Sequence, residues 1–579
     1  MNSLQICFKR SLQVVIGMLL FIFAPLTIAH AADFSHVNTK VASDKTWTIT
    51  FNDPVLESSI SKDSIYVLDK NNIKQDTSLS VKGNVVLVQA PAQGYEPGQS
   101  YTLHITDSVK SQKSNKRLNK AVIKPFTIVE GYAVVDIQAD GTYSPIATYA
   151  SFEEANGHLQ KQQAIVYNNK YVKMPAGFVA TSPKKVTLIY KQATFTAGFQ
   201  YAGVAADTEL QYVDATADYV KVHVAGQDMY VKHEDVTLIP TAAAKGQSYY
   251  SADDKGLWHR IYHHHTGTYD SSYLIGDKPA FLQRNVDYYS TDGATFVDAN
   301  GQVVGESYAY FQYISPRVPT SYSAEQLNAF IAKELQVREQ SGNKLYANAT
   351  TKSPLQNMGA LLKEMEQQYR INALLILSTA IHESNYGMSC HAQNYNNLFG
   401  LKVTDTNSAC SMNVDKTSSK YFTSIEKNVQ ALVENLNQYY LDPLNMSDWR
   451  YNGVALGNKM VGMNVRYASD PYWGSKIAGH MYRADQALGG KDYKKYRLGF
   501  TSTANVSVRT APLVTTGAQD NRAYQYKLDW TIKRLDHMPI TLSNTSSEKA
   551  DWLRVISERT TDITDLYTVN ENVRHVNVY

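Results

Sequence analysis

The chain has 579 residues, of which 43% are hydrophobic and 19% charged, and it holds 41 tyrosines against 17 phenylalanines and 6 tryptophans. This length is too great for one hydrophobic core and predicts roughly three to five folded domains. The formal net charge of +3, without a basic run, gives no support to a nucleic-acid-binding function. A tyrosine-rich surface is typical of carbohydrate-binding modules, because the ring stacks on a sugar while the hydroxyl stays hydrated. Many small β domains with tyrosine in their sheets would have the same composition.

Residues 1–32 have the pattern of a secretory signal peptide. Two basic residues precede an apolar run over 14–28, and the small residues of Ala29-His30-Ala31 follow it. Pro25 interrupts the run, which disfavours a membrane anchor, and no later stretch is long and apolar enough to span a bilayer. We therefore predict a secreted protein, extracellular or in the cell wall, with no membrane span after signal cleavage.

Residues 33–130 predict an all-β domain, because short alternating runs such as 47–51 and 101–105 lie between turn signals. The segments FNDPV and GQSYTLHITDSV in this region resemble bacterial Ig-like modules. The resemblance implies a β-sandwich.

Residues 131–245 also predict mostly β structure, with one helix over 151–162 that a capping box at Ser151–Glu154 would begin. The segment YVKVHVAGQDMYVKHEDVTLIP resembles a bacterial SH3-like module. Residues 246–320 form a predicted tyrosine-rich β linker region. It contains His263-His264-His265, but consecutive residues cannot all face one ion in regular structure, so we expect no metal site there.

A long helix is predicted to end at His382-Glu383-Ser384-Asn385, because Leu374–Leu377 is apolar all round and the small polar residues suit a helix C-terminus. The Glu383 carboxyl would be partly desolvated and close to the negative end of the helix dipole. Both effects raise a carboxyl pKa. A general acid that works near neutral pH needs such a pKa.

The motif AIHESNYG at 380–387, followed by NYNNLFGLK at 394–402 and RYASDP at 466–471, resembles the glucosaminidase domain of glycoside hydrolase family 73. These bacterial peptidoglycan hydrolases have a lysozyme-like fold. The resemblance implies a mainly helical α+β catalytic domain, which we place at residues 321–490. Its other helices are expected to begin by capping boxes at Ser323 and at Thr423–Glu426, and with Asp470 as cap before Pro471.

Glycoside hydrolysis needs a proton for the leaving oxygen and stabilisation of an oxocarbenium-like centre. The resemblance assigns the acid role to Glu383 and a catalytic role opposite it to Tyr467. Asp405, Asp415 and Glu426 are candidates for a second carboxylate, with Asp415 preferred. The substrate's own N-acetyl group is the alternative nucleophile. The predicted substrate-binding residues are Tyr386, Asn396, Asn397, Phe399 and Trp473, although a core tryptophan is an equal interpretation of the last.

Of the three cysteines, Cys7 would leave with the signal peptide, whereas Cys390 and Cys410 remain. Because exported proteins form disulfides, we predict that these two pair and close the loop that carries Asn396 and Phe399. Two cysteines alone do not make a metal site, and we predict no metal and no cofactor.

Residues 491–579 again predict β structure, and ANVSVRTAP at 504–512 resembles the opening of a bacterial SH3-like domain. The fold class is therefore multidomain, with a lysozyme-like catalytic domain and several all-β accessory domains, namely an Ig-like sandwich and SH3-like barrels.

We predict a cell-wall hydrolase that cuts the β-1,4 bond between N-acetylglucosamine and N-acetylmuramic acid in peptidoglycan glycan strands. Its accessory domains would contact wall peptides or anionic wall polymers. The alternatives are a muramidase or lytic transglycosylase on the same fold, and a non-catalytic wall-binding protein. A zinc peptidase is disfavoured, because Tyr386 stands where the second histidine of a zinc-binding helix would be.

Overall fold

The computed structural model describes residues 4–5, 39–403, 408–526, 537–561 and 565–579. The predicted signal peptide, apart from Leu4 and Gln5, lies outside the described residues, as do Cys7 and Asp405. The chain divides into two compact units, of which the first comprises Met1–Phe178, Asp214–Asp218 and Thr237–Ala244. The second comprises Val179–Val213, Tyr219–Val236 and Lys245–Tyr579.

The first unit begins with two four-stranded sheets that share one core. The strands are β1 (Leu4–Gln5), β3 (Trp47–Thr50), β6 (Val85–Gln89) and β5 (Ser78–Lys82), in that order, and β2 (Thr39–Val41), β8 (Val122–Ile128), β7 (Ser100–Ile105) and β4 (Ile65–Asp69). Alternate residues of both sheets are buried in one cluster, where the Trp47 and Phe126 ring centroids lie 5.1 Å apart. This is the β-sandwich that the alternating runs predict.

A third sheet of the first unit has the order β10 (Tyr143–Tyr149), β9 (Tyr132–Ile137), β11 (Gln163–Tyr167) and β12 (Lys170–Lys173). Helix α1 (Phe152–His158) begins as predicted, because the Ser151 side chain accepts a hydrogen bond from the backbone N–H of Glu154. The predicted end at residue 162 is wrong. Asn156 and Gly157 are poor helix formers, and Leu159 is already extended and packs against the core.

Two further sheets have seven strands each. The first has the order β15 (Gln200–Val204), β14 (Thr187–Tyr190), β18 (Gln227–Val231), β17 (Val220–Val224), β16 (Glu209–Ala215), β13 (Gly177–Thr181) and β19 (Val236–Pro240). The second has the order β29 (Arg522–Tyr526), β28 (Val506–Arg509), β32 (Leu566–Val569), β31 (Trp552–Val555), β30 (Pro539–Leu542), β27 (Arg497–Thr501) and β33 (Val573–His575). Within the described ranges neither sheet closes into a barrel, so the SH3-like assignments stay predictions.

Small sheets make up the predicted tyrosine-rich linker. They are the three-stranded sheet β20 (Tyr249–Asp253), β21 (Gly256–Arg260) and β24 (Tyr273–Gly276), and the pairs β22 (Tyr262–His263) with β23 (Thr268–Tyr269) and β25 (Thr295–Val297) with β26 (Val303–Glu306). The three consecutive histidines face different partners. His263 contacts the Asp207 carbonyl at 3.0 Å, His264 the Glu209 carboxylate at 2.8 Å and His265 the Thr181 carbonyl at 3.1 Å.

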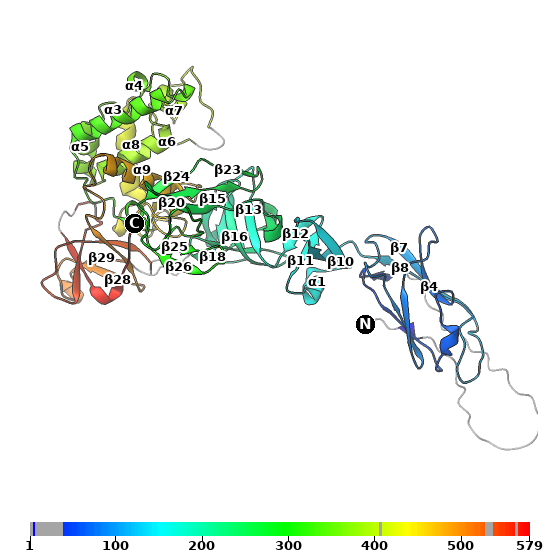
Figure 1. The fold of residues 1–579 in the computed structure, drawn as a ribbon. Coiled ribbons are helices and arrows are strands. Elements are labelled where there is room, and N and C mark those ends of the chain that lie inside the picture. The colour runs from blue at the N-terminus through cyan, green and yellow to red at the C-terminus, as the bar shows by residue number, and fades with distance from the viewer. Residues whose placement is uncertain (1–3, 6–38, 404–407, 527–536, 562–564) are drawn as a thin grey trace, which may run out of the picture. The chain divides into compact units, whose positions relative to one another are not determined.

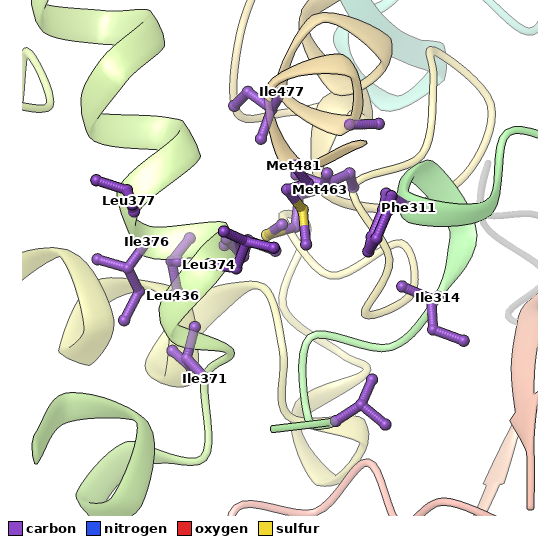
Figure 2. Packing of buried hydrophobic residues seen from close by; sticks show 14 of the residues in the cluster. Phe311, Ile314, Ile371, Leu374, Ile376, Leu377, Leu436, Met463, Ile477 and Met481 are labelled. Atoms are coloured by element: carbon purple, nitrogen blue, oxygen red, sulfur yellow. The ribbon is translucent and has the colours of Figure 1, made fainter. Parts of the chain in front are cut away.

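The remaining part of the second unit is mainly helical (Figure 1). Its helices are α2 (Tyr310–Tyr313), α3 (Ala324–Gln340), α4 (Ala349–Lys352), α5 (Gly359–Tyr369), α6 (Ala373–Ser384), α7 (Cys390–Tyr395), α8 (Ile425–Tyr439) and α9 (Trp473–Ala487). Every residue from Ile371 to Ile381 is buried, as the all-round apolar pattern predicts. Figure 2 shows Leu374 of α6 pointing toward Met463 and toward Met481 of α9, and one continuous core extends from these helices to the C-terminal sheet.

The helix starts test the capping predictions. Ser323 and Gln326 form the predicted capping box of α3. Helix α8 is capped by Ser424 and not by Thr423, because the Ser424 hydroxyl accepts from the N–H of Lys427. The assignment of Asp470 as the cap of α9 is wrong, since the helix begins at Trp473.

No helix in the described part of the chain combines the length and the apolar character that crossing a membrane requires.

Candidate active site

Glu383 lies in the last turn of α6, and the chain turns sharply after it. Asn385, Tyr386 and Gly387 have φ values of 50°, 59° and 77°, all in the left-handed region. The Ser384 hydroxyl donates to the Ala380 carbonyl and accepts from the N–H of Gly387 at 2.7 Å. A Cβ at position 387 would lie 2.5 Å from the Ser353 hydroxyl oxygen, so only glycine fits this turn.

The Glu383 carboxyl is held by a tryptophan from a helix 90 residues away in sequence. Trp473 Nε1 donates to Glu383 Oε1 at 2.7 Å. Burial is the main cause that raises the pKa of Glu383, and the nearby Asp470 carboxylate raises it further, whereas the hydrogen bond from Trp473 lowers it. The net direction is upward, as required of a carboxyl that stays protonated long enough to act as a general acid.

Tyr467 is connected to Glu383 through Trp473, because the Tyr467 and Trp473 rings pack against each other. The two ring centroids lie 4.6 Å apart with a 32° interplanar angle, and Tyr440 packs edge-on against Tyr467 at 5.4 Å. Burial, followed by the charge of Glu383, raises the pKa of the Tyr467 hydroxyl well above its ordinary value. The phenol therefore stays protonated at neutral pH and is available as a hydrogen-bond donor.

The loop that carries Tyr467 is fastened by a buried lysine. Lys459 is 1% exposed, and its Nζ donates to the carbonyls of Asn464, at 3.0 Å, and Ala468. Burial lowers the pKa of Lys459 to about 7. Asn464 in turn donates to the carbonyls of Asp470 and Pro471, at 3.1 and 3.0 Å.

The same contacts explain why α9 begins late. Because Asn464 holds two carbonyls of the Asp470–Pro471 turn, this segment cannot join the helix. Asp470 accepts from the N–H of Tyr472 at 2.8 Å and pairs with Lys476 at 2.7 Å. The aspartate is therefore a turn residue and an ion-pair partner, and not the helix cap.

In the loop after α7, the side chains of Asn396 and Asn397 form hydrogen bonds within the protein. Asn397 is 1% exposed, and its side-chain amide donates to the carbonyls of Leu401 and Lys420 and accepts from the N–H of Leu401. Phe399 is also buried, and the half-buried Asn396 donates to the Phe422 carbonyl at 2.9 Å. The prediction that Asn397 and Phe399 contact sugar is therefore not supported, since their side chains are occupied within the protein.

The prediction that Tyr386 and Trp473 bind substrate is corrected in the same way. The Tyr386 ring is buried beneath the Arg338 guanidinium, and its hydroxyl accepts from Arg338 at 2.7 Å and from Arg483 at 3.4 Å. Trp473 is 3% exposed, and its indole N–H donates to Glu383. Neither ring is free to stack on a sugar.

Among the described residues, no contact joins Asp415 to Glu383. Asp415 is exposed and accepts from the N–H and hydroxyl of Thr417, contacts that lower the pKa of its carboxyl. Glu426 is also exposed, and its pKa is lowered by the Ser424 hydroxyl. Within the described residues, the carboxylate that acts on Glu383 is Asp470, which is already paired with Lys476.

Residues 359–486 match the family model described as mannosyl-glycoprotein endo-beta-N-acetylglucosaminidase, and this range includes Glu383, Tyr467 and Trp473. This segment is a glucosaminidase domain. The chain thus carries a domain of glycoside hydrolase type. Residues 28–127 match the model described as a bacterial Ig-like domain, which confirms the resemblance of the N-terminal sandwich.

Two curated Streptococcus pneumoniae proteins, provisionally named endo-beta-N-acetylglucosaminidases, are 31% identical to the chain over 271 residues. The aligned part is 47% of this chain but only 35% and 33% of those proteins. The chain therefore spans about a third of the length of these relatives.

Solved structures with likeness to the chain include S. aureus Autolysin E in complex with the disaccharide NAG-NAM, at 20% identity over 34% of this chain and 82% of that one. A Major Bifunctional Autolysin aligns at 19% identity over 31% and 69%. The TM-scores are 0.23 and 0.21, which are too low to establish a shared fold.

Two features of the glucosaminidase domain were missed from the sequence: the buried Lys459 and the contact of Trp473 with Glu383. A lysine in an otherwise apolar run, ValAlaLeuGlyAsnLysMetValGly, was the available signal for the first.

The disulfide expected from the cysteine count is present. Cys390, the first residue of α7, is bonded to Cys410 with 6.2 Å between their Cα atoms.

Proposed function

We propose that this chain is a secreted cell-wall hydrolase that cleaves peptidoglycan glycan strands, with Glu383 as general acid and then general base. The observation that carries the proposal is the Glu383 carboxyl itself. It lies at the end of a buried helix, its pKa is raised by burial, and its orientation is held by the 2.7 Å hydrogen bond from Trp473. The glucosaminidase family of the surrounding domain supplies the reaction class.

Protonated Glu383 would donate its proton to the glycosidic oxygen as the bond from that oxygen to the anomeric carbon breaks. The carboxylate left behind accepts the Trp473 N–H, which stabilises its charge. Glu383 then takes a proton from the water that attacks the anomeric carbon, so the carboxyl returns to its starting state and one water is consumed.

The exposed position of Asp415 favours the substrate's own N-acetyl group as the nucleophile. Its carbonyl oxygen would form a bond with the anomeric carbon as the leaving group departs, and this bond closes a second ring on the sugar. Water would then attack the anomeric carbon and open the second ring again. We infer that Tyr467 assists, because its ring packs 4.6 Å from that of Trp473 and the charge of Glu383 acts on its hydroxyl. A hydrogen bond from this hydroxyl to the reacting sugar would stabilise the transition state.

The bond that we propose is the β-1,4 bond after N-acetylglucosamine, in keeping with the name of the S. pneumoniae relatives. The test is to digest purified peptidoglycan with the chain, reduce the fragments with borohydride and identify the new ends by mass spectrometry. Reduced N-acetylglucosamine ends support the proposal. Muramitol ends would indicate a muramidase, and anhydromuramic ends a lytic transglycosylase.

We further propose that the two seven-stranded sheets are SH3-like modules that contact wall peptides or anionic wall polymers. Their tyrosines and open β edges suit such ligands. A folded chain that binds wall material but releases no new ends from several wall types would instead be a non-catalytic wall-binding protein.

A further inference from the structure

Trp449 is an exposed tryptophan in the same unit as the candidate active site. It follows α8, and 57% of its surface is accessible to solvent. A tryptophan normally buries most of its large ring, so an exposed one offers a flat apolar face to a ligand. The C–H groups on one face of a sugar ring fit such a surface.

Two guanidinium groups flank the Trp449 ring, and they differ in how their charge is used. Arg450 lies 5.6 Å from the ring centroid and binds the Asp448 carboxylate through Nε, at 2.9 Å, and Nη2, at 2.8 Å. Arg466 lies 5.1 Å from the centroid. Its Nη2 donates to the Gln200 carbonyl at 3.2 Å, and within the described ranges Arg466 has no carboxylate partner.

The Nε of Arg466 is also buried without an acceptor. This buried Nε is out of reach of a ligand, so an incoming carboxylate would meet the part of the half-buried Arg466 side chain that solvent reaches, where the guanidinium charge attracts it. Burial disfavours the charged form and lowers the pKa of Arg466, which an incoming carboxylate would reverse.

Trp449 and Arg466 lie next to residues of the candidate active site. Arg466 is the residue before Tyr467, and Tyr440, at the end of α8, packs against Tyr467 at 5.4 Å. Arg450 covers the neighbouring Tyr439 at 3.3 Å. Trp449 and Arg466 are therefore linked to Glu383 through Tyr467 and Trp473, the second of which donates its N–H to the Glu383 carboxyl.

We propose that Trp449 and Arg466 form a binding subsite for a sugar that carries a carboxylate, with the ring stacked on the indole and the carboxylate paired with the guanidinium. The inference rests on the proposed function, since it names the charged class of glycan that this site takes. Such a subsite would distinguish acidic wall glycans from neutral polymers of N-acetylglucosamine.

The test measures binding by calorimetry at low salt, in the full chain with Glu383→Gln so that the ligand is not consumed. One probe is a neutral tetrasaccharide of N-acetylglucosamine, and the other is a peptide-free wall tetrasaccharide whose muramic residues bear free lactyl carboxylates. The variants are Trp449→Ala and Arg466→Gln. The controls are Leu444→Ala, a nearby side chain that is 60% exposed, and Arg522→Gln, an arginine of the C-terminal sheet whose partner is the Asp520 carboxylate.

Trp449→Ala is expected to weaken both ligands about tenfold, the loss of one ring-stacking contact. Arg466→Gln is expected to weaken only the acidic ligand, and this effect should shrink at high salt. The two controls should change either affinity by less than about twofold. Equal affinities for Trp449→Ala and Leu444→Ala, or an equal loss of both ligands in Arg466→Gln, would overturn the inference.

Because turnover is not measured, the two proposals fail separately. If the unmodified chain cuts no wall glycan but the binding pattern holds, the hydrolase proposal is wrong and the subsite stands. If the chain cuts glycan but both variants bind like the controls, only the subsite is wrong.

Discussion

The indole N–H of Trp473 donates to Glu383 Oε1 at 2.7 Å, and the same indole packs against Tyr467 at 4.6 Å. One buried side chain thus connects the candidate acid to the candidate hydrogen-bond donor. It also makes the charge state of Glu383 sensitive to a residue that touches no substrate, because a donor to the carboxylate favours its ionised form.

Glu383→Gln is expected to lower kcat/KM by roughly a hundredfold to ten-thousandfold, the usual contribution of a general acid or base. The substitution should also stabilise the fold at pH 7. The folded-state pKa of Glu383 is raised above its ordinary value of 4.5, so the folded chain binds more protons than the unfolded chain above that pH. Stability is therefore lost as pH rises through the folded pKa.

Thermal melts of both proteins between pH 4 and pH 8 check this sign. The difference in Tm should be near zero at the acid end and should grow in favour of Glu383→Gln toward pH 8. A variant that is less stable than the parent at pH 8 would show that the ionised Glu383 carboxylate stabilises the fold, contrary to the burial argument.

Lys459→Met should flatten the pH dependence of stability on the alkaline side. Burial lowers the folded-state pKa of Lys459 to about 7 from an ordinary value of 10.5, so the unfolded chain binds the extra proton between these values. The parent should therefore gain stability as pH rises from about 7 to 10.5, and the variant should lack this gain. Denaturant unfolding at several pH values measures the slope.

The same substitution should lower kcat/KM, because the Asn464 and Ala468 carbonyls that shape the Tyr467 loop lose their donor. Lys476→Met is a matched control, since Lys476 is a lysine on the neighbouring helix whose partner is a carboxylate. If the two variants had equal stability slopes between pH 7 and 10.5, the special role of Lys459 would be refuted.

Asn397→Ala is expected to cost about 2–4 kcal/mol of folding stability, because three backbone groups lose hydrogen bonds and the buried Asn428 amide loses an acceptor. Asn396→Ala, which removes one half-buried hydrogen bond, should cost about 1 kcal/mol. Urea unfolding of both variants gives the comparison. Substrate KM that rises in Asn397→Ala with unchanged stability would restore the direct sugar contact that the buried position argues against.

The sequence allowed Glu383 to be placed, because helical periodicity and the small residues after it locate a helix end within a few residues. It did not allow the Trp473 contact to be found, since 90 residues separate the partners and a buried tryptophan has no local signature. The α9 cap was misplaced for a similar reason. Asp470-Pro471 is a good local start signal, but the more distant Asn464 holds its carbonyls outside the helix.

The assignment of Asn397 and Phe399 to substrate shows a different limit. Amides and aromatics suit both a sugar site and a tightly hydrogen-bonded loop, and composition cannot separate the two. Only the burial of both side chains, at 1% and 3% exposure, distinguishes them.

The pH profile of kcat/KM on a soluble wall glycan, measured for the parent, Trp473→Phe and Glu383→Gln, tests the central claim most directly. If Glu383 is the general acid, activity falls as pH rises through its pKa, and this alkaline limb is absent in Glu383→Gln because activity is lost. Trp473→Phe removes the hydrogen bond that lowers the Glu383 pKa, so its alkaline limb should move to higher pH. An unmoved or lowered limb in Trp473→Phe, or full activity in Glu383→Gln, would contradict the account.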